Sequence, residues 1–238
     1  MNELSFMAEE SLTMLTILGK RSSINVRKVL WTCEEAGLAY QQEDYGSGFK
    51  PPDTPEFQRL NPNSPVPVLL DDDFVLWESN SICRYLARKA ERWDLLPAEP
   101  QPAAEVEHWM DWQATEFNTA RRHAFMGLVR KDPRFQDPVA IKESIAARTH
   151  YVRIVEAQLQ RTGAWIAGER FTPADIVLGL SVHRWKMTPF AHPEMPAVER
   201  WYMALNQRPA FMRHGNNGVA SSIKRSPRGF FYHPAIAS

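Results

Sequence analysis

The chain has 238 residues, which corresponds to one large domain or two small ones. Its 28 Lys and Arg residues balance 28 Asp and Glu residues, and this zero net charge offers no electrostatic basis for binding nucleic acid. Two cysteines are too few for a disulfide framework or a cysteine-rich zinc site, and no apolar run is long enough to span a membrane.

The N-terminal part of the chain alternates predicted strands with predicted helices. Short β-branched or aromatic runs predict strands at residues 14–18, 40–45, 68–71 and 74–77. Helical spacing or capping residues predict helices at residues 22–37, 56–60 and from Ser79 onward. This order predicts an α/β domain with a parallel strand pair and a closing antiparallel hairpin.

The C-terminal part shows helical periodicity and no convincing strand. Predicted helices lie at residues 104–130, 139–161, 173–188 and 195–206. A proline-rich connector at 95–102 separates the two parts, so we expect domains at 14–94 and 103–212, with terminal extensions at 1–13 and 213–238. The first residues lack the charge and apolar core of a signal peptide, which favours a cytoplasmic protein without a membrane association.

Several common catalytic and metal motifs are absent from the sequence. No two histidines are three or four residues apart, and there is no phosphate-binding loop, nucleophile elbow or Cys-x-x-Cys motif. Cys33 and Cys83 fall on apolar faces of predicted helices, where a buried and unreactive thiol is the favoured interpretation. We therefore expect no bound metal.

Ser23 and Asn25 lie where the first strand turns into the first helix. The N-terminus of a helix has unpaired N–H groups and a partial positive charge, so it can hold an anion or a thiolate. A hydroxyl group there can donate to the same ligand. Taken alone, this feature favours simple helix capping by Ser23 or Asn25.

Two further segments near the hairpin could contact a ligand. Pro67 opens a strand, and a cis bond after Val66 would free the Val66 backbone to pair with an extended peptide, although an ordinary edge-strand proline is the commoner case. Ser79 is expected at the N-cap of the next helix, with Glu78 just outside it, where a carboxylate can meet an ammonium group. A plain cap is an equally good interpretation of that pair.

Thr172 and Asp175 flank Pro173 in a pattern typical of a capping box. Asp replaces the usual Glu at the third helical position. We interpret this pair as structural, marking the start of a buried helix.

These features occur in an order that resembles the cytosolic glutathione S-transferase superfamily, and bacterial theta-like and beta-like members in particular. The similar segments are Ser-Ile-Asn-Val-Arg-Lys-Val at 23–29, Leu-Asn-Pro-Asn-Ser-Pro-Val-Pro-Val-Leu at 60–69, Leu-Trp-Glu-Ser-Asn-Ser-Ile at 76–82 and Phe-Thr-Pro-Ala-Asp-Ile at 171–176. The resemblance implies a thioredoxin-like domain joined to an all-helical domain, usually in a homodimer.

The resemblance also implies roles for individual residues. Ser23, with Ser22 as the neighbouring candidate, would stabilise the thiolate of glutathione, and Asn25 would assist. Val66, before a cis Pro67, would pair with the cysteinyl backbone of glutathione. Glu78 and Ser79 would hold its γ-glutamyl end, and Thr172 with Asp175 would form the family's structural capping box.

The electrophile pocket of the family lies between the domains, along the first long helix of the helical domain. The candidates on that helix are Trp109, Trp112, Glu116 and Arg121, of which the first three share one helical face. Aromatic residues packed in the core are the simpler interpretation of the two tryptophans.

The expected function is a glutathione transferase of detoxification, which adds the glutathione thiolate to a small hydrophobic electrophile. One alternative is a glutathione-dependent disulfide reductase, as in bacterial members with a Thr-Pro-Asn motif, which Asn25 favours. Another is a non-catalytic protein-interaction module with the same fold. Glutathione is the expected co-substrate in both enzymatic cases.

Overall fold

The N-terminal part of the chain forms a mixed four-stranded sheet in the computed structural model, which describes residues 14–120 and 122–217. The strands are β1 (Leu15–Leu18), β2 (Tyr40–Glu43), β3 (Val68–Asp71) and β4 (Phe74–Trp77), in the spatial order β2-β1-β3-β4. Strand β1 pairs with β2 in parallel and with β3 antiparallel, and β3 pairs antiparallel with β4. The predicted parallel pair and hairpin are both confirmed.

The strand register brings three connecting segments to one end of the sheet. Leu18, the last residue of β1, faces Val68, the first residue of β3. Val68 in turn faces Trp77, the last residue of β4. The segments that follow β1, precede β3 and follow β4 therefore lie next to one another.

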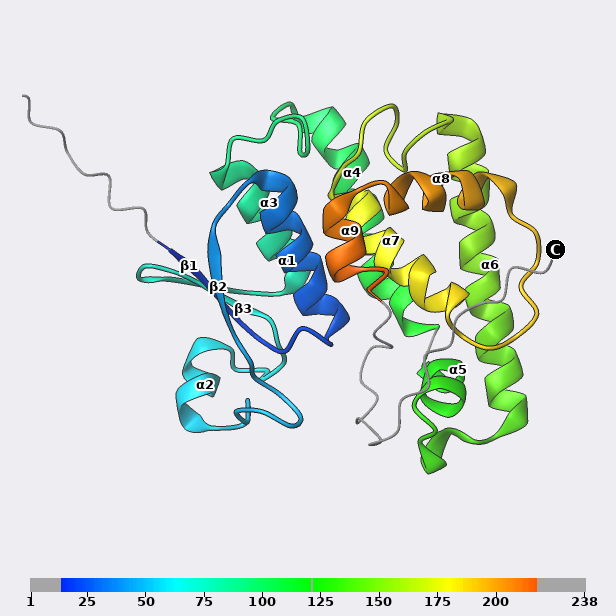
Figure 1. The fold of residues 1–238 in the computed structure, drawn as a ribbon, viewed down its shortest axis with the longest axis horizontal. Coiled ribbons are helices and arrows are strands. Elements are labelled where there is room, and N and C mark those ends of the chain that lie inside the picture. Colours follow the sequence, from blue (N-terminus) through cyan, green and yellow to red (C-terminus); the bar gives the residue numbers. More distant parts are fainter. Residues whose placement is uncertain (1–13, 121, 218–238) are drawn as a thin grey trace, which may run out of the picture.

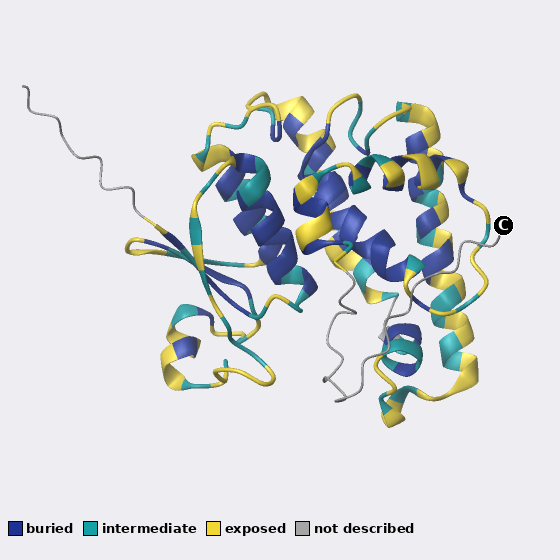
Figure 2. Cartoon of the chain, in the orientation of Figure 1, coloured by how far each residue is buried: buried dark blue, intermediate teal, exposed yellow. Residues whose placement is uncertain are grey.

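Helices α1 (Ile24–Ala36) and α3 (Ser79–Lys89) pack against each other and lie between the sheet and the helical part of the molecule (Figure 1). Helix α1 also contacts α7 and α9 of the helical part. The short helix α2 (Pro55–Leu60) buries Phe57 against Leu18 and Val68 in a smaller second cluster. The α1–α3 side thus carries the main core, which continues into the helical part (Figure 2).

The regular elements of the C-terminal part are all helices within its described length. It contains α4 (Pro100–Trp112), η1 (Gln113–Phe117), α5 (Arg122–Ala124), η2 (Phe125–Val129), η3 (Pro133–Phe135), α6 (Pro138–Thr162), α7 (Pro173–Lys186), α8 (Pro196–Asn206) and α9 (Pro209–His214). Helix α7 is buried along nearly its whole length and forms the centre of this part. In the two described stretches of chain, no helix has the combined length and apolar character needed to cross a membrane.

The structure corrects several predicted boundaries. Helix α4 begins at Pro100 and not at residue 104, because proline fits the first turn of a helix, where its missing N–H has no partner to lose. The single helix predicted for 104–130 is interrupted by the π-helical turns η1 and η2, which apolar spacing does not reveal. Helix α9 was not predicted, and β2 ends at Glu43 rather than at residue 45.

Candidate active site

Gly19 joins the end of β1 to the segment before β3 by close packing. It has a φ of 147°, and a Cβ atom there would lie 2.5 Å from Val26 Cγ2 and 2.9 Å from Val66 Cβ. Only glycine fits such a position without displacing its neighbours. The first turn of α1 and Val66 are therefore held on either side of Gly19.

Ser23 is the N-cap residue of α1, with extended backbone angles. Its hydroxyl makes no capping hydrogen bond to the helix, so the capping interpretation of this side chain is not supported. The side chain is half-buried, and Asn25 follows as the second residue of the helix. A hydroxyl donor and the unpaired N–H groups of a 13-residue helix thus occur together at this end of the sheet.

Val66 offers a free backbone edge beside this helix start. The Val66–Pro67 peptide bond is cis. Neither the N–H nor the C=O of Val66 has a hydrogen-bond partner among residues 14–120 and 122–217. Asn61 holds the preceding turn, because its side chain donates to the Pro65 carbonyl at 2.7 Å and accepts from the Asn63 N–H at 3.0 Å.

Glu78 is the N-cap of α3, and Ser79 is the first helical residue. The helix therefore begins one residue earlier than expected, since Ser79 was the predicted N-cap. The Glu78 carbonyl already accepts the first helical hydrogen bond, from Ile82 N–H at 2.9 Å, which sets this boundary. Glu78 has a φ of 73°, a conformation that costs a non-glycine residue about 1–3 kcal/mol. Its side chain is exposed at the same end of the sheet as Val66, whereas Ser79 is buried.

Lys28 anchors the start of α3 to the helical part of the molecule. It is only 3% exposed, and its Nζ donates to Asn80 Oδ1 at 3.1 Å and to Gln113 Oε1 at 2.7 Å. Asn80 Nδ2 donates to the Met110 carbonyl at 2.6 Å, and Gln113 Nε2 donates to Ser181 Oγ at 2.8 Å. No sequence motif indicates this buried network, because its members are far apart in the chain.

The two tryptophans predicted for the electrophile pocket lie in an aromatic cluster. Trp109 is buried, and its ring lies 5.4 Å from that of Trp112, which stacks on Phe117 at 5.5 Å. The indole N–H of Trp109 has no hydrogen-bond partner in the described part of the chain. Glu116 is exposed and accepts from Tyr151 at 3.3 Å. Arg121 lies outside the described residues.

Asp175 is a fully buried carboxylate at the start of α7. It accepts hydrogen bonds from the Thr172 N–H at 2.9 Å, the Ile166 N–H at 3.0 Å and the Trp201 indole at 2.8 Å. Thr172 and Asp175 form a capping box, with Thr172 as N-cap. Burial raises the pKa of Asp175 to about 6 despite these donors.

Neither cysteine contributes a reactive thiol. Cys33 and Cys83 are fully buried, as predicted, and burial raises the pKa of both, that of Cys83 to about 11. Within the described ranges there is also no cluster of three or more His, Cys, Asp or Glu side chains that could hold a metal ion. A nucleophilic thiol at this site would therefore have to come from a bound molecule.

Comparisons with known proteins identify the family to which this chain is similar. The family model "Glutathione S-transferase, N-terminal domain" matches residues 13–88, and "Glutathione S-transferase, C-terminal domain" matches residues 120–209. The glutathione S-transferase GstB of Escherichia coli is 37% identical over 199 residues, which cover 83% of this chain and 95% of the relative. Glutathione S-transferase 3 of Zea mays is 33% identical over 207 residues, covering 84% of this chain and 92% of the relative.

A solved structure shares both the fold and much of the sequence. The theta-class glutathione S-transferase of Xanthomonas axonopodis pv. citri, determined with glutathione bound, has a TM-score of 0.79 and 38% identity. The match covers 85% of this chain and 97% of that protein. The chain therefore belongs to the cytosolic glutathione S-transferase superfamily and is a transferase of that family.

Proposed function

We propose that this transferase binds glutathione at the end of the sheet formed by Gly19, Val66 and Glu78, and that Ser23 stabilises the glutathione thiolate. The observation that carries the proposal is the position of Ser23. Its hydroxyl lies at the N-terminus of α1 and makes no capping bond, so it is available to a ligand. The bound glutathione of the similar theta-class structure supports glutathione as the ligand here.

The residues around Ser23 suit the remaining groups of glutathione. The backbone N–H and C=O of Val66, next to cis Pro67, have no partner among the described residues and can pair with the cysteinyl backbone as an added strand does. The Glu78 carboxylate can bind the γ-glutamyl ammonium group. The Ser79 hydroxyl and the N–H groups at the start of α3 can bind the adjacent carboxylate.

The chemistry needs no general base from the protein. A free thiol is mostly protonated at neutral pH, whereas the thiolate is the nucleophile. A hydrogen bond to a charged group contributes about 1.5–3 kcal/mol, and a helix N-terminus adds about 0.3–1 kcal/mol. Since about 1.4 kcal/mol corresponds to one pKa unit, Ser23 and α1 can lower the pKa of the thiol by one unit or more.

Asn25 and the aromatic cluster complete the proposed site. The Asn25 amide is placed in the first turn of α1, where it can assist Ser23 at the thiol. We assign Trp109, Trp112 and Glu116, together with Arg121, to the pocket for a small hydrophobic electrophile. The adjacent aromatic rings of Trp109 and Trp112 support this assignment, because such rings can pack against an apolar substrate.

The domain bounds, the oligomeric state, the cellular location and the biological role are proposed from membership of the family. We place the glutathione-binding domain at 14–94 and the helical domain at 103–212, and propose a cytoplasmic homodimer that acts in detoxification without a metal. Membership of the transferase family favours neither disulfide reduction nor a purely non-catalytic function.

The test compares wild type with Ser23→Ala and Ser22→Ala, its neighbour in the same turn. We expect wild type and Ser22→Ala to conjugate glutathione to a chloro-dinitrobenzene substrate, and Ser23→Ala to lose about tenfold or more in kcat/KM. Full activity of Ser23→Ala would contradict the assignment of Ser23. Reduction of a hydroxyethyl disulfide without conjugation would instead support the reductase.

A further inference from the structure

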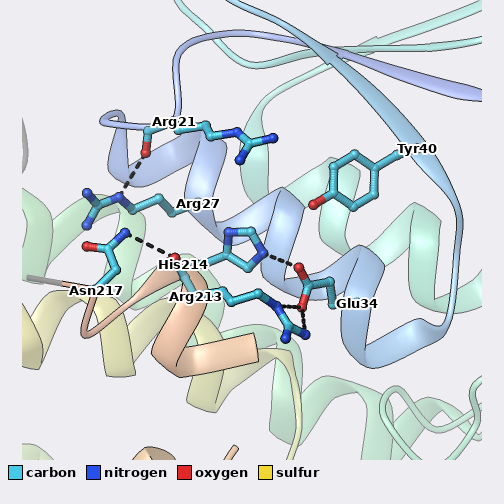
Figure 3. A pocket seen from close by; sticks show the side chains of 7 residues that line it. All are labelled: Arg21, Arg27, Glu34, Tyr40, Arg213, His214 and Asn217. Atoms are coloured by element: carbon cyan, nitrogen blue, oxygen red, sulfur yellow. Dashed lines mark hydrogen bonds and ion pairs between the residues drawn. The ribbon is translucent and has the colours of Figure 1, made fainter. Parts of the chain in front are cut away.

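A polar pocket of about 200 Å³ lies between α1, the start of β2 and the C-terminal end of α9 (Figure 3). Its lining includes Arg21, Arg27, Glu34, Tyr40, Arg213 and His214. None of the residues proposed for glutathione is among the described residues that line it. The pocket is therefore a separate feature of the molecule.

Positive charge exceeds negative charge among the described residues that line this pocket. Arg21, Arg27 and Arg213 contribute three guanidinium groups, whereas Glu34 is the one carboxylate among the described lining residues. Burial lowers the pKa of His214, which leaves its ring neutral near pH 7. The described lining thus has two positive charges in excess.

The one carboxylate is already engaged at one side of the pocket. Glu34 Oε2 accepts from Arg213 Nε at 2.7 Å, and Oε1 contacts His214 Nε2 (Figure 3). Arg21 lies away from this pair, and its Nε donates to the neutral amide of Gln42 at 2.7 Å. An anion entering the pocket would therefore meet Arg21 without first displacing a carboxylate from it.

Arg27 and Tyr40 add donors to the walls of the pocket. Arg27 is only 4% exposed, and its Nε donates to the Arg21 carbonyl at 2.9 Å. Burial lowers the pKa of Arg27 to about 10, so the guanidinium group remains charged at neutral pH. The Tyr40 hydroxyl faces the pocket and has no hydrogen-bond partner in the described ranges (Figure 3).

We propose that this α1–α9 pocket binds a phosphate-class oxyanion through Arg21, Arg27 and Arg213, with the Tyr40 hydroxyl as a further donor. Guanidinium groups match the oxygens of phosphate in paired hydrogen bonds, and two excess positive charges match a dianion. The alternative is an ion cluster that only joins α9 to α1 through Glu34. In that case added phosphate would have no effect.

Calorimetric titration at fixed ionic strength tests this proposal, with inorganic phosphate and phenyl phosphate as ligands. Arg21→Gln removes one guanidinium group, and Tyr40→Phe removes only a hydroxyl, so the second variant is expected to fold normally. Arg59→Gln is the matched control, because Arg59 is an exposed arginine of α2 that pairs with Glu56 outside the pocket. All titrations are repeated with saturating glutathione, because Arg21 lies two residues before Ser23.

We expect saturable binding of one phosphate per chain, about tenfold weaker in Arg21→Gln, weaker also in Tyr40→Phe, and unchanged in Arg59→Gln. Binding of both ligands identifies a phosphate group of a larger molecule, whereas binding of inorganic phosphate alone identifies the free ion. Absence of saturable binding to wild type overturns the proposal. Binding of phosphate by both Arg21→Gln and Tyr40→Phe with wild-type affinity also overturns it, and so does loss of phosphate binding in the presence of saturating glutathione.

Discussion

Replacement of Gly19 by alanine tests whether close packing at this residue builds the glutathione site. The added Cβ would lie 2.5 Å from Val26 Cγ2 and 2.9 Å from Val66 Cβ. Val26 is fully buried and β-branched, so its methyl group cannot easily rotate away. We therefore expect the Gly19→Ala variant to relieve the clash by displacing Val66, whose backbone we propose to bind glutathione.

The expected cost of Gly19→Ala has two parts. A φ of 147° is strained for alanine by about 1–3 kcal/mol, and overpacking adds about 1–3 kcal/mol. Gly168→Ala separates these parts, because Gly168 has a similar φ of 136° but no atom within 4 Å of its Cβ position. Gly168→Ala should therefore lose only the strain energy.

Urea unfolding and glutathione titration of both variants provide the measurements. Gly19→Ala should lose more stability than Gly168→Ala and bind glutathione at least several-fold more weakly than wild type. Gly168→Ala should bind glutathione as wild type does. If Gly19→Ala matched Gly168→Ala in stability and wild type in affinity, the packing argument would be refuted.

Three further substitutions test buried polar groups. Lys28→Met leaves the amide oxygens of Asn80 and Gln113 without this donor. We therefore expect a free energy of unfolding about 2 kcal/mol lower, measured in urea, and a raised KM for glutathione. An unchanged KM would contradict the role of Lys28 in anchoring α3. Asp175→Ala orphans buried donors and should cost more than about 3 kcal/mol in the same assay, whereas a cost below about 1 kcal/mol would mean that the capping box matters little. His183→Asn should flatten the acid dependence of stability. Burial lowers the pKa of His183 from 6.5 to about 4, so its stabilising contribution is complete above pH 6.5 and decreases by about 3 kcal/mol as the pH falls to 4. Parallel stability curves for wild type and His183→Asn between these pH values would contradict this assignment.

The predicted fold was accurate where local residues determine the backbone. The hairpin at 68–71 and 74–77 matches the structure because an acidic turn separates two apolar runs. Gly37 ends α1 in the left-handed conformation, with a φ of 73°, at the end of the helix predicted for residues 22–37. Helix boundaries were less accurate where proline occurs, since Pro100 and Pro209 begin helices and do not interrupt them.

The site was predictable in its segments but not in its geometry. The positive φ of Glu78 shifts the start of α3 by one residue, and no sequence pattern specifies such an angle for a glutamate. Lys28 was missed because its partners lie 52 and 85 residues away, so only the folded structure brings them together. The α1–α9 pocket was missed for the same reason, since Arg213 and Glu34 are 179 residues apart.

The central claim is that Ser23 stabilises the thiolate of bound glutathione, and titration of the bound thiol by its thiolate absorption tests it most directly. The two protein thiols are buried with raised pKa values, so they do not interfere near neutral pH. In wild type the thiol should titrate at least about one unit below the free value of about 8.5, and Ser23→Ala should return it toward that value. Identical titration curves for wild type and Ser23→Ala, both with glutathione saturating, would contradict the account.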